Sequence, residues 1–167
     1  MVSKARDVSQ HYSTIVAIDP GIRASGVAVF HRGSLVAAKW VKGHESDVVS
    51  WTQRQVLGIP QAFVGRVCSF VEEPIVVRGR AFRGKTESLL QLSQTVGMLR
   101  AMFEGVGVDV ERAPVRDWKR NVPTEALHER LKRKLDEYEK SVIEWPAKSA
   151  AHNVVDAISI GLWALGR

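Results

Sequence analysis

Short apolar runs separated by turn residues fill the first part of the chain. Apolar and β-branched residues cover 14–18, 26–30 and 35–41, and the tetrapeptide His31-Arg32-Gly33-Ser34 separates the last two runs. Runs of this length are typical of strands, and a short turn between two of them is typical of a hairpin. The pattern predicts three consecutive strands in an antiparallel meander.

Helical spacing and further strands alternate along the rest of the chain. Apolar residues recur with helical spacing over 87–104, residues 148–165 are mostly small and apolar, and weaker or more charged helical patterns cover 47–63 and 124–140. Strands are expected at 66–72 and 108–113. This order predicts an α/β fold in which helices cover both faces of a mixed five-stranded sheet. We expect one domain over 14–167 and a flexible N-terminal tail at 1–13.

Composition and charge narrow the class of protein. The chain has 167 residues, a net charge of +6 and a pI of about 9.8, which favours a polyanionic partner such as nucleic acid. No apolar run has the length of a membrane span, and the polar N-terminus lacks the core of a signal peptide. We therefore expect a cytoplasmic protein, in a bacterial or phage-infected cell, without a membrane partner. A single cysteine, Cys68, excludes an internal disulfide and a cysteine-rich zinc site.

Three carboxylates occupy positions that this architecture can bring together. Asp19 ends the first predicted strand, Glu72 ends the fourth, and Asp156 lies inside the apolar last helix. Because a buried carboxylate needs a partner, three of them together favour a divalent cation. Magnesium prefers such oxygen ligands, and two ions about 4 Å apart can catalyse phosphodiester hydrolysis. The residues predict a site for two Mg²⁺ ions, in which we expect Mn²⁺ to substitute.

Neighbouring polar residues leave parts of this site open. His152 and Asn153 precede Asp156 by four and three residues, so both share a helical face with it. Either can support a metal ion or a water, and a polar pair at a helix surface explains them equally well. Glu73 competes with Glu72, because side chains alternate along a strand and one of the two faces the site.

A basic loop follows the second of these acids directly. Its cations and one aromatic residue are suited to clamping phosphates and to stacking on or wedging beside a base, although a solvated surface loop is the alternative. These residues are Arg78, Arg80, Phe82, Arg83 and Lys85.

The ordered motifs resemble those of the RuvC-type Holliday junction resolvases, which have a ribonuclease-H-like fold. The resemblance rests on the segments IVAIDPG and SGVAV around Asp19, FVEEP around Glu72, SLLQLSQTVG after it, PVRDWK at 114–119, and NVVDAI around Asp156. The segments occur in the family's order across nearly the whole chain. The segment Asn121-Val122-Pro123 departs from the family's small-residue pattern, which points to a divergent branch such as the phage resolvases.

The resemblance implies a homodimeric, metal-dependent endonuclease that cuts four-way DNA junctions and needs no nucleotide cofactor. It implies that Asp19, Glu72 and Asp156 are catalytic metal ligands. The family has Asp or His as a fourth ligand three residues before the last Asp, and here Asn153 stands there, with His152 beside it. The resemblance also places Lys119 at the family's basic position, where we expect it to bind the scissile phosphate. We expect the flanking Arg116 and Arg120 to support it on the DNA.

Other functions remain open at this point. A ribonuclease-H-like nuclease acting on RNA–DNA hybrids or flaps would share the acidic site. A non-catalytic junction-binding protein could keep the fold, although the retained acids disfavour it. An ATP-binding protein of the actin and sugar-kinase type also opens with Asp-x-Gly, but it needs two such lobes, and this chain has the length of one.

Overall fold

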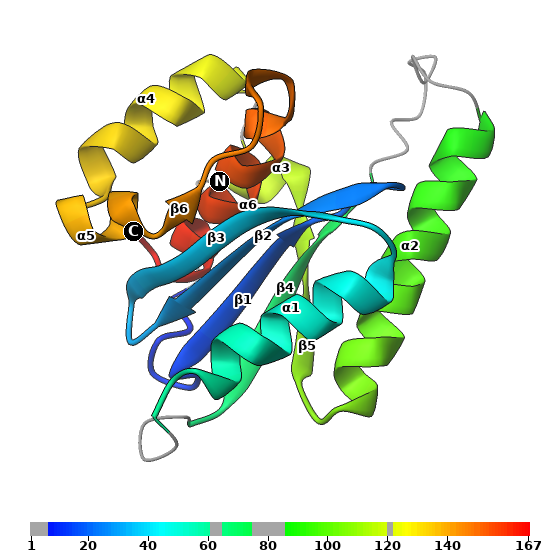
Figure 1. The fold of residues 1–167 in the computed structure, drawn as a ribbon, viewed down its shortest axis with the longest axis horizontal. Helices are drawn as coiled ribbons and strands as arrows, with labels where there is room; N and C mark the ends of the chain where they lie inside the picture. Colours follow the sequence, from blue (N-terminus) through cyan, green and yellow to red (C-terminus); the bar gives the residue numbers. More distant parts are fainter. Residues whose placement is uncertain (1–6, 61–64, 75–85, 120–121) are drawn as a thin grey trace.

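Among the described residues, six strands form one mixed sheet at the centre of the molecule (Figure 1). The computed structural model describes residues 7–60, 65–74, 86–119 and 122–167. The strands are β1 (Thr14–Asp19), β2 (Ala24–His31), β3 (Ser34–Lys42), β4 (Val67–Glu73), β5 (Asp109–Pro114) and β6 (Ile143–Glu144). Their spatial order is β5-β4-β1-β2-β3-β6. β2 runs antiparallel to both β1 and β3, and the other neighbours are parallel, so the predicted meander is confirmed.

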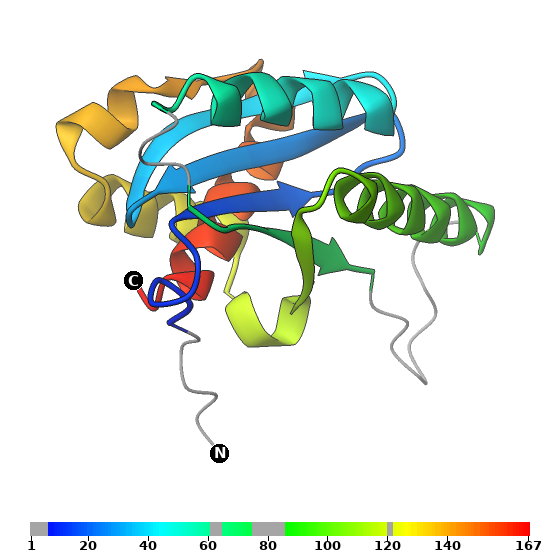
Figure 2. The same cartoon turned by 90° about the horizontal axis from the view of Figure 1, so that it is seen from below.

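Helices cover both faces of the sheet, as predicted (Figures 1 and 2). Helices α1 (Glu45–Leu57) and α2 (Thr86–Gly105) pack on one face. Helices α6 (Ala151–Ala164), α4 (Thr124–Lys134) and α3 (Val115–Trp118) lie on the other, and the short α5 (Glu137–Ser141) follows α4. A 3₁₀ turn at Lys148–Ala150 precedes α6. Within the described residues, no helix is long and apolar enough to span a membrane.

Alternating side chains on the strands explain the two-layered core. In β1, Ile15 and Ala17 belong to the apolar cluster under α6, whereas Val16 and Ile18 belong to the cluster under α1 and α2. Side chains along a strand point alternately to its two faces, so β1 is buried on both. Burial of these apolar side chains therefore determines the face toward which a polar side chain at the end of the strand points.

The structure departs from the sequence prediction at several places. The helix expected over 47–63 ends at Leu57, before Gly58 and Pro60. The charged helix expected over 124–140 is two helices, because Leu135 is extended and Asp136 starts α5 with a capping box, in which its carboxylate accepts from the N–H of Glu139 at 2.8 Å. The sheet also has a sixth strand, since β6 adds a two-residue pairing to the edge of β3. A strand of this length is too short to show an alternation of apolar and polar residues in the sequence.

Residues 7–13, assigned to the N-terminal tail from the sequence, are hydrogen-bonded to the domain. The N–H of Val8 donates to the carbonyl of Ala164 at 3.1 Å, and the N–H of Ser13 donates to the carbonyl of Arg66 at 3.1 Å. Val8 and Tyr12 also pack against the core under α6. This segment therefore joins the C-terminal end of α6 to the start of β4.

Candidate active site

The strand register places two of the predicted acids side by side at one edge of the sheet. Ile18 of β1 pairs with Val71 of β4, so the next residues, Asp19 and Glu72, are neighbours on adjacent parallel strands. Asp19 follows Ala17 at a spacing of two, and Glu72 follows Phe70 in the same way; Ala17 and Phe70 both face α6. Alternation therefore directs both carboxylates toward α6.

Helix α6 supplies the third acid. Asp156 lies midway along α6, and its exposed fraction is 7%. The helix approaches the sheet closely because Gly26, the β2 partner of Asp19, has no side chain: a Cβ there would collide with the backbone carbonyl of Asn153. Gly26 thus allows the N-terminal half of α6 to lie directly over the strand ends.

The three carboxylates are close enough to perturb one another electrostatically. Burial raises the pKa of Asp19 well above its ordinary value, and the charges of Glu72 and Asp156 raise it further. Burial and then the charge of Asp156 raise the pKa of Glu72 to about 7. Burial also raises the pKa of Asp156. Such mutual repulsion among buried acids is typical of a functional site.

Lys119 supplies a positive charge to this cluster from the segment after α3. Its ammonium donates to Oδ2 of Asp156 at 2.7 Å, and its charge lowers the pKa values of Asp19, Glu72 and Asp156. The ammonium also lies 5.3 Å from the centroid of the Trp118 ring. The structure therefore brings together four of the residues singled out from the sequence.

The donor chemistry and charge of this cluster suit a divalent cation. When all three are ionised, the carboxylates and the Lys119 ammonium together carry two negative charges, which one Mg²⁺ would balance. Oδ1 of Asp156 is buried and has no hydrogen-bond partner among the described residues. A buried carboxylate oxygen without a partner is costly, and a cation would satisfy it.

The cluster is nevertheless not arranged as a finished metal cage. Within the described part of the chain, no three His, Cys, Asp or Glu side chains already stand in a metal-holding arrangement. Oδ2 of Asp156 is engaged by Lys119. Ligation by all three acids would therefore require side-chain adjustment, beginning with Lys119.

Glu72 and Glu73 have different neighbours in the structure. Glu73 forms an ion pair with Arg112 of β5, with 3.0 Å between Nη1 and Oε1. Glu72 interacts electrostatically with Asp156 and Lys119. Glu73 therefore stabilises the β4–β5 pairing on the other side of the strand from the acidic cluster.

His152 and Asn153 lie at the start of α6, one turn before Asp156. His152 is exposed, and its charge contributes to lowering the pKa of Asp156. Asn153 is half-buried. These positions fit a supporting role for either residue, and metal ligation by them stays a prediction.

Most of the predicted DNA-contacting residues lie outside the described residues: Arg78, Arg80, Phe82, Arg83, Lys85 and Arg120. Of the others, Lys119 is in the cluster. Arg116 is on α3, where its side chain is 82% exposed and its Nε lies 3.5 Å from Oδ1 of Asp117. DNA contact by Arg116 stays a prediction.

Sequence reasoning missed a group of aromatic and basic residues on β3 and after β6. The ammonium of Lys42 lies 5.0 Å from the centre of the Trp40 ring, and Trp145 lies beside His128 of α4. Alternation in 35–41 indicates a strand, but the pairing of β3 with β6 is needed to see that these residues gather at one edge.

Comparison with known proteins reveals similarity at the level of structure. No family model matches the sequence, and no curated protein matches it. Thermus thermophilus RuvC in complex with a Holliday junction substrate is 20% identical, with a TM-score of 0.58 over 91% of this chain and 92% of that chain. A second structure of Thermus thermophilus RuvC is also 20% identical, with a TM-score of 0.55 over 90% and 92% of the two chains.

The similarity extends to a eukaryotic protein. The yeast mitochondrial Holliday junction resolvase Ydc2 is 12% identical, with a TM-score of 0.55 over 91% of this chain and 77% of that chain. The chain therefore has the fold of the RuvC-type resolvases, and the expected ribonuclease-H-like architecture is confirmed.

Proposed function

We propose that this protein is a metal-dependent endonuclease that resolves four-way DNA junctions by paired hydrolysis of phosphodiester bonds. The observation that carries the proposal is the convergence of Asp19, Glu72 and Asp156, from two strands and a helix, into one acidic cluster. The cluster lies on a fold shared with resolvases, one of them described in complex with a Holliday junction substrate. The net charge of +6 is compatible with a DNA partner.

In this proposal Asp19, Glu72 and Asp156 would hold two Mg²⁺ ions. When bound, such ions activate water for attack on phosphorus and stabilise the charge on the departing 3′ oxygen. The protein charge balances one ion, and the negative charge of the substrate phosphate would contribute to balancing the second. The products would carry 5′-phosphate and 3′-hydroxyl ends.

Lys119 acts in this proposal through its ammonium. Without DNA it offsets part of the charge of Asp156, to which it donates at 2.7 Å. With DNA bound, the same ammonium would donate to a non-bridging oxygen of the scissile phosphate and stabilise its developing charge. Asn153 and His152 would orient Asp156 or a water at the start of α6.

Paired cutting of one junction requires two active sites, and we propose that a homodimer provides them. Support comes from the outer side of α2, where Leu90 is 61% exposed and Met98 is 54% exposed. Two large apolar side chains at i and i+8 lie on similar sides of a helix. Leu90→Glu combined with Met98→Glu should convert a dimer into a monomer in analytical ultracentrifugation, and an unchanged sedimentation coefficient would refute this interface.

A substrate comparison tests the proposed function. The full chain is incubated with Mg²⁺ and an immobile four-way junction, an RNA–DNA hybrid of equal length, or a linear duplex, and the nicks are mapped. We expect symmetrical nicks in the junction and little cutting of the other two substrates. Preferential cutting of the hybrid would instead identify a ribonuclease-H-like activity, and binding without cutting would identify a junction-binding protein.

A further inference from the structure

Strands β3 and β6 extend the edge that carries the acidic cluster. Asp19 of β1 pairs with Gly26 of β2, and Gly26 pairs with Trp40 of β3. Lys39 of β3 pairs with Glu144 of β6, and these two strands are parallel. Trp145, the residue that follows β6, therefore lies at the level of Trp40. A single transverse row runs from Glu72 and Asp19 to the two tryptophans.

Trp40 and Trp145 project to the same face of the sheet as the acids. Trp40 packs against the core cluster under α6. Ala38, two residues earlier on β3 and therefore on the same face, belongs to that cluster. Ile143 is buried in that cluster too, and Trp145 follows it at a spacing of two. The contact between Trp145 and His128 of α4 confirms this direction, since α4 covers that face.

Trp145 is exposed in spite of this packing. Its exposed fraction is 46%, and the His128 ring supports it at 5.3 Å between ring centroids and an interplanar angle of 36°. Burial of a tryptophan is strongly favourable. A tryptophan that is supported by another ring on one side and open to solvent elsewhere is suited to stacking with a planar ligand.

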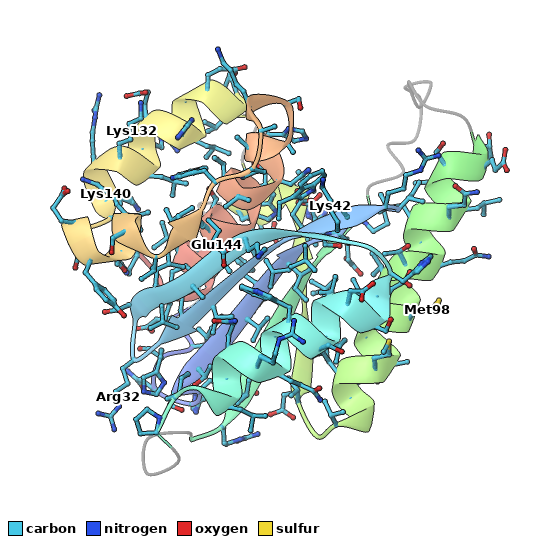
Figure 3. The ribbon with its side chains drawn as sticks, in the orientation of Figure 1. Arg32, Lys42, Met98, Lys132, Lys140 and Glu144 are labelled. Carbon is cyan, nitrogen blue, oxygen red and sulfur yellow. The ribbon has the colours of Figure 1, made fainter. Side chains whose placement is uncertain are left out.

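One lysine lies over the Trp40 ring, and a second follows Trp145 closely in the sequence. Lys42 is exposed, with its ammonium 5.0 Å from the Trp40 ring centroid, and it lies at the upper edge of the sheet in Figure 3. Lys148 is exposed three residues after Trp145. Glu144, the residue before Trp145, is paired with Lys39 at 2.7 Å. Aromatic rings interleaved with lysines are typical of surfaces that bind unpaired nucleic acid.

The spacing suits a DNA substrate that also reaches the acidic cluster. Three steps between neighbouring strands separate β1 from β6, which is about 14 Å at ~4.8 Å per step. That distance equals about four nucleotides of a duplex at ~3.4 Å per nucleotide along one strand. A strand cut at Asp19 can therefore pass over Trp145 a few nucleotides away.

We propose that Trp145, supported by His128, stacks on a nucleobase left unpaired at the branch point of the DNA, while Lys42 and Lys148 contact the flanking phosphates. This inference rests on the proposed function for the identity of the substrate. It assigns Trp145 as a substrate-positioning residue on the β6 side of the acidic cluster. A tryptophan ring can stack on any nucleobase, because every base has a π-face. This contact would therefore distinguish unpaired from paired DNA and would not select a base sequence.

Equilibrium binding tests the stacking role without relying on cleavage. Fluorescence anisotropy is measured with Ca²⁺ on three labelled DNAs: a four-way junction, an oligo-dT strand and a fully paired duplex. Replacement of Trp145 by Ala or Leu should weaken binding to the junction and to oligo-dT by about 5- to 150-fold, the range of one base–aromatic stack. Binding to the duplex should change less than about 2-fold, because its bases are paired.

Two further variants control for packing and for general loss of aromatic surface. Trp145→Phe keeps a π-face and should retain most of the affinity, whereas Trp145→Leu keeps an apolar contact with His128 but loses the stack. Tyr138→Ala removes an aromatic side chain of 59% exposure on α5 and should leave binding unchanged. Thermal melting of each variant by circular dichroism establishes that it is folded.

The outcomes separate this inference from the proposed function. If the Trp145 variants bind all three DNAs as tightly as the wild type, or lose affinity equally for the duplex, the stacking role is wrong. A change in sedimentation coefficient on Trp145→Leu would instead make Trp145 a protein–protein contact and also overturn it. If the wild type fails to cut junctions but its oligo-dT binding depends on Trp145, the proposed function fails while the stacking role stands.

Discussion

The ammonium of Lys119 lies 2.7 Å from Oδ2 of Asp156, within a cluster that also contains Asp19 and Glu72. Without a metal ion, this contact supplies the positive charge that the buried carboxylate needs. The side chain of Lys119 is 24% exposed, so it can reach toward DNA without crossing the core. A divalent cation and Lys119 would therefore compete for the same oxygen.

Replacement of Lys119 by Met should separate metal binding from catalysis. Removing the ammonium leaves the carboxylates more negative, so Mn²⁺ should bind at least as tightly as it does to the wild type. Single-turnover cleavage of a four-way junction should fall by about 10²- to 10³-fold, the usual cost of losing one transition-state donor. Lys132→Met, which removes a lysine paired with Glu129 on α4, is the control. Weaker Mn²⁺ binding by Lys119→Met would contradict the competition.

The raised pKa of Glu72 predicts an unusual dependence of stability on pH. Its pKa is about 7 in the folded protein and 4.5 as the ordinary value. The folded state binds the proton more tightly, so this group's contribution to stability is full below pH 4.5 and is lost as the pH rises through 7. Without divalent cations, Glu72→Gln should therefore stabilise the protein at pH 8 and have little effect at pH 4.5.

Thermal melting in EDTA measures this effect. We expect Glu72→Gln to raise Tm at pH 8 by about 3 °C or more, since ~1 kcal/mol corresponds to ~2–4 °C in a domain of this size. Glu73→Gln is the matched control. It removes the ion pair with Arg112 and should lower Tm slightly or leave it unchanged. Equal shifts of Tm at both pH values would show that Glu72 has an ordinary pKa.

Gly26 should be required for the geometry of the site more than for folding. In Gly26→Ala the new methyl group would meet the Asn153 carbonyl, so α6 must move away from the strand ends and carry Asp156 from Asp19. We expect junction cleavage to fall by about 10²-fold, since a shift of ~1 Å has effects of that size. Gly105→Ala at the end of α2, where a Cβ meets nothing within 4 Å, should preserve cleavage. Full activity of Gly26→Ala would argue against close approach of α6 as the basis of the site.

Arg167 stabilises the fold through its contact with a buried carboxylate. Arg167 Nη1 lies 2.7 Å from Oε1 of Glu139, whose side chain is 2% exposed, and the N–H of Leu35 donates to the same oxygen at 2.8 Å. Arg167→Ala would leave that buried charge without its cation, which should lower the free energy of unfolding by about 3 kcal/mol in urea denaturation. Lys132→Ala breaks the exposed pair with Glu129 and should cost less than ~1 kcal/mol. Similar effects of the two variants would refute the role of burial.

Local patterns in the sequence were sufficient to predict the order of the main elements and to single out three acids that the fold brings close together. Strands and amphipathic helices show a periodicity over a few neighbouring residues. Asp19, Glu72 and Asp156 can be recognised because each lies in or next to an apolar segment. Alternation alone left the choice between Glu72 and Glu73 open, and the tertiary structure pairs Glu73 with Arg112, away from the acidic cluster.

What the sequence could not predict depends on long-range contacts. β6 is two residues long and forms only by pairing with β3. The position of Trp145 on the same sheet edge as the acids therefore cannot be predicted from the local sequence. The break at Leu135 and Asp136 depends on a cap and on burial of Leu135 in the core. The Lys119–Asp156 contact joins residues from two elements and likewise requires the tertiary fold.

Titration of Mn²⁺ into the DNA-free protein by isothermal calorimetry is the measurement that tests the central proposal most directly. The wild type and Glu73→Gln should show saturable binding, and the triple variant Asp19→Asn, Glu72→Gln, Asp156→Asn should show none. Indistinguishable isotherms for the wild type and the triple variant would contradict the assignment of these carboxylates as the metal site.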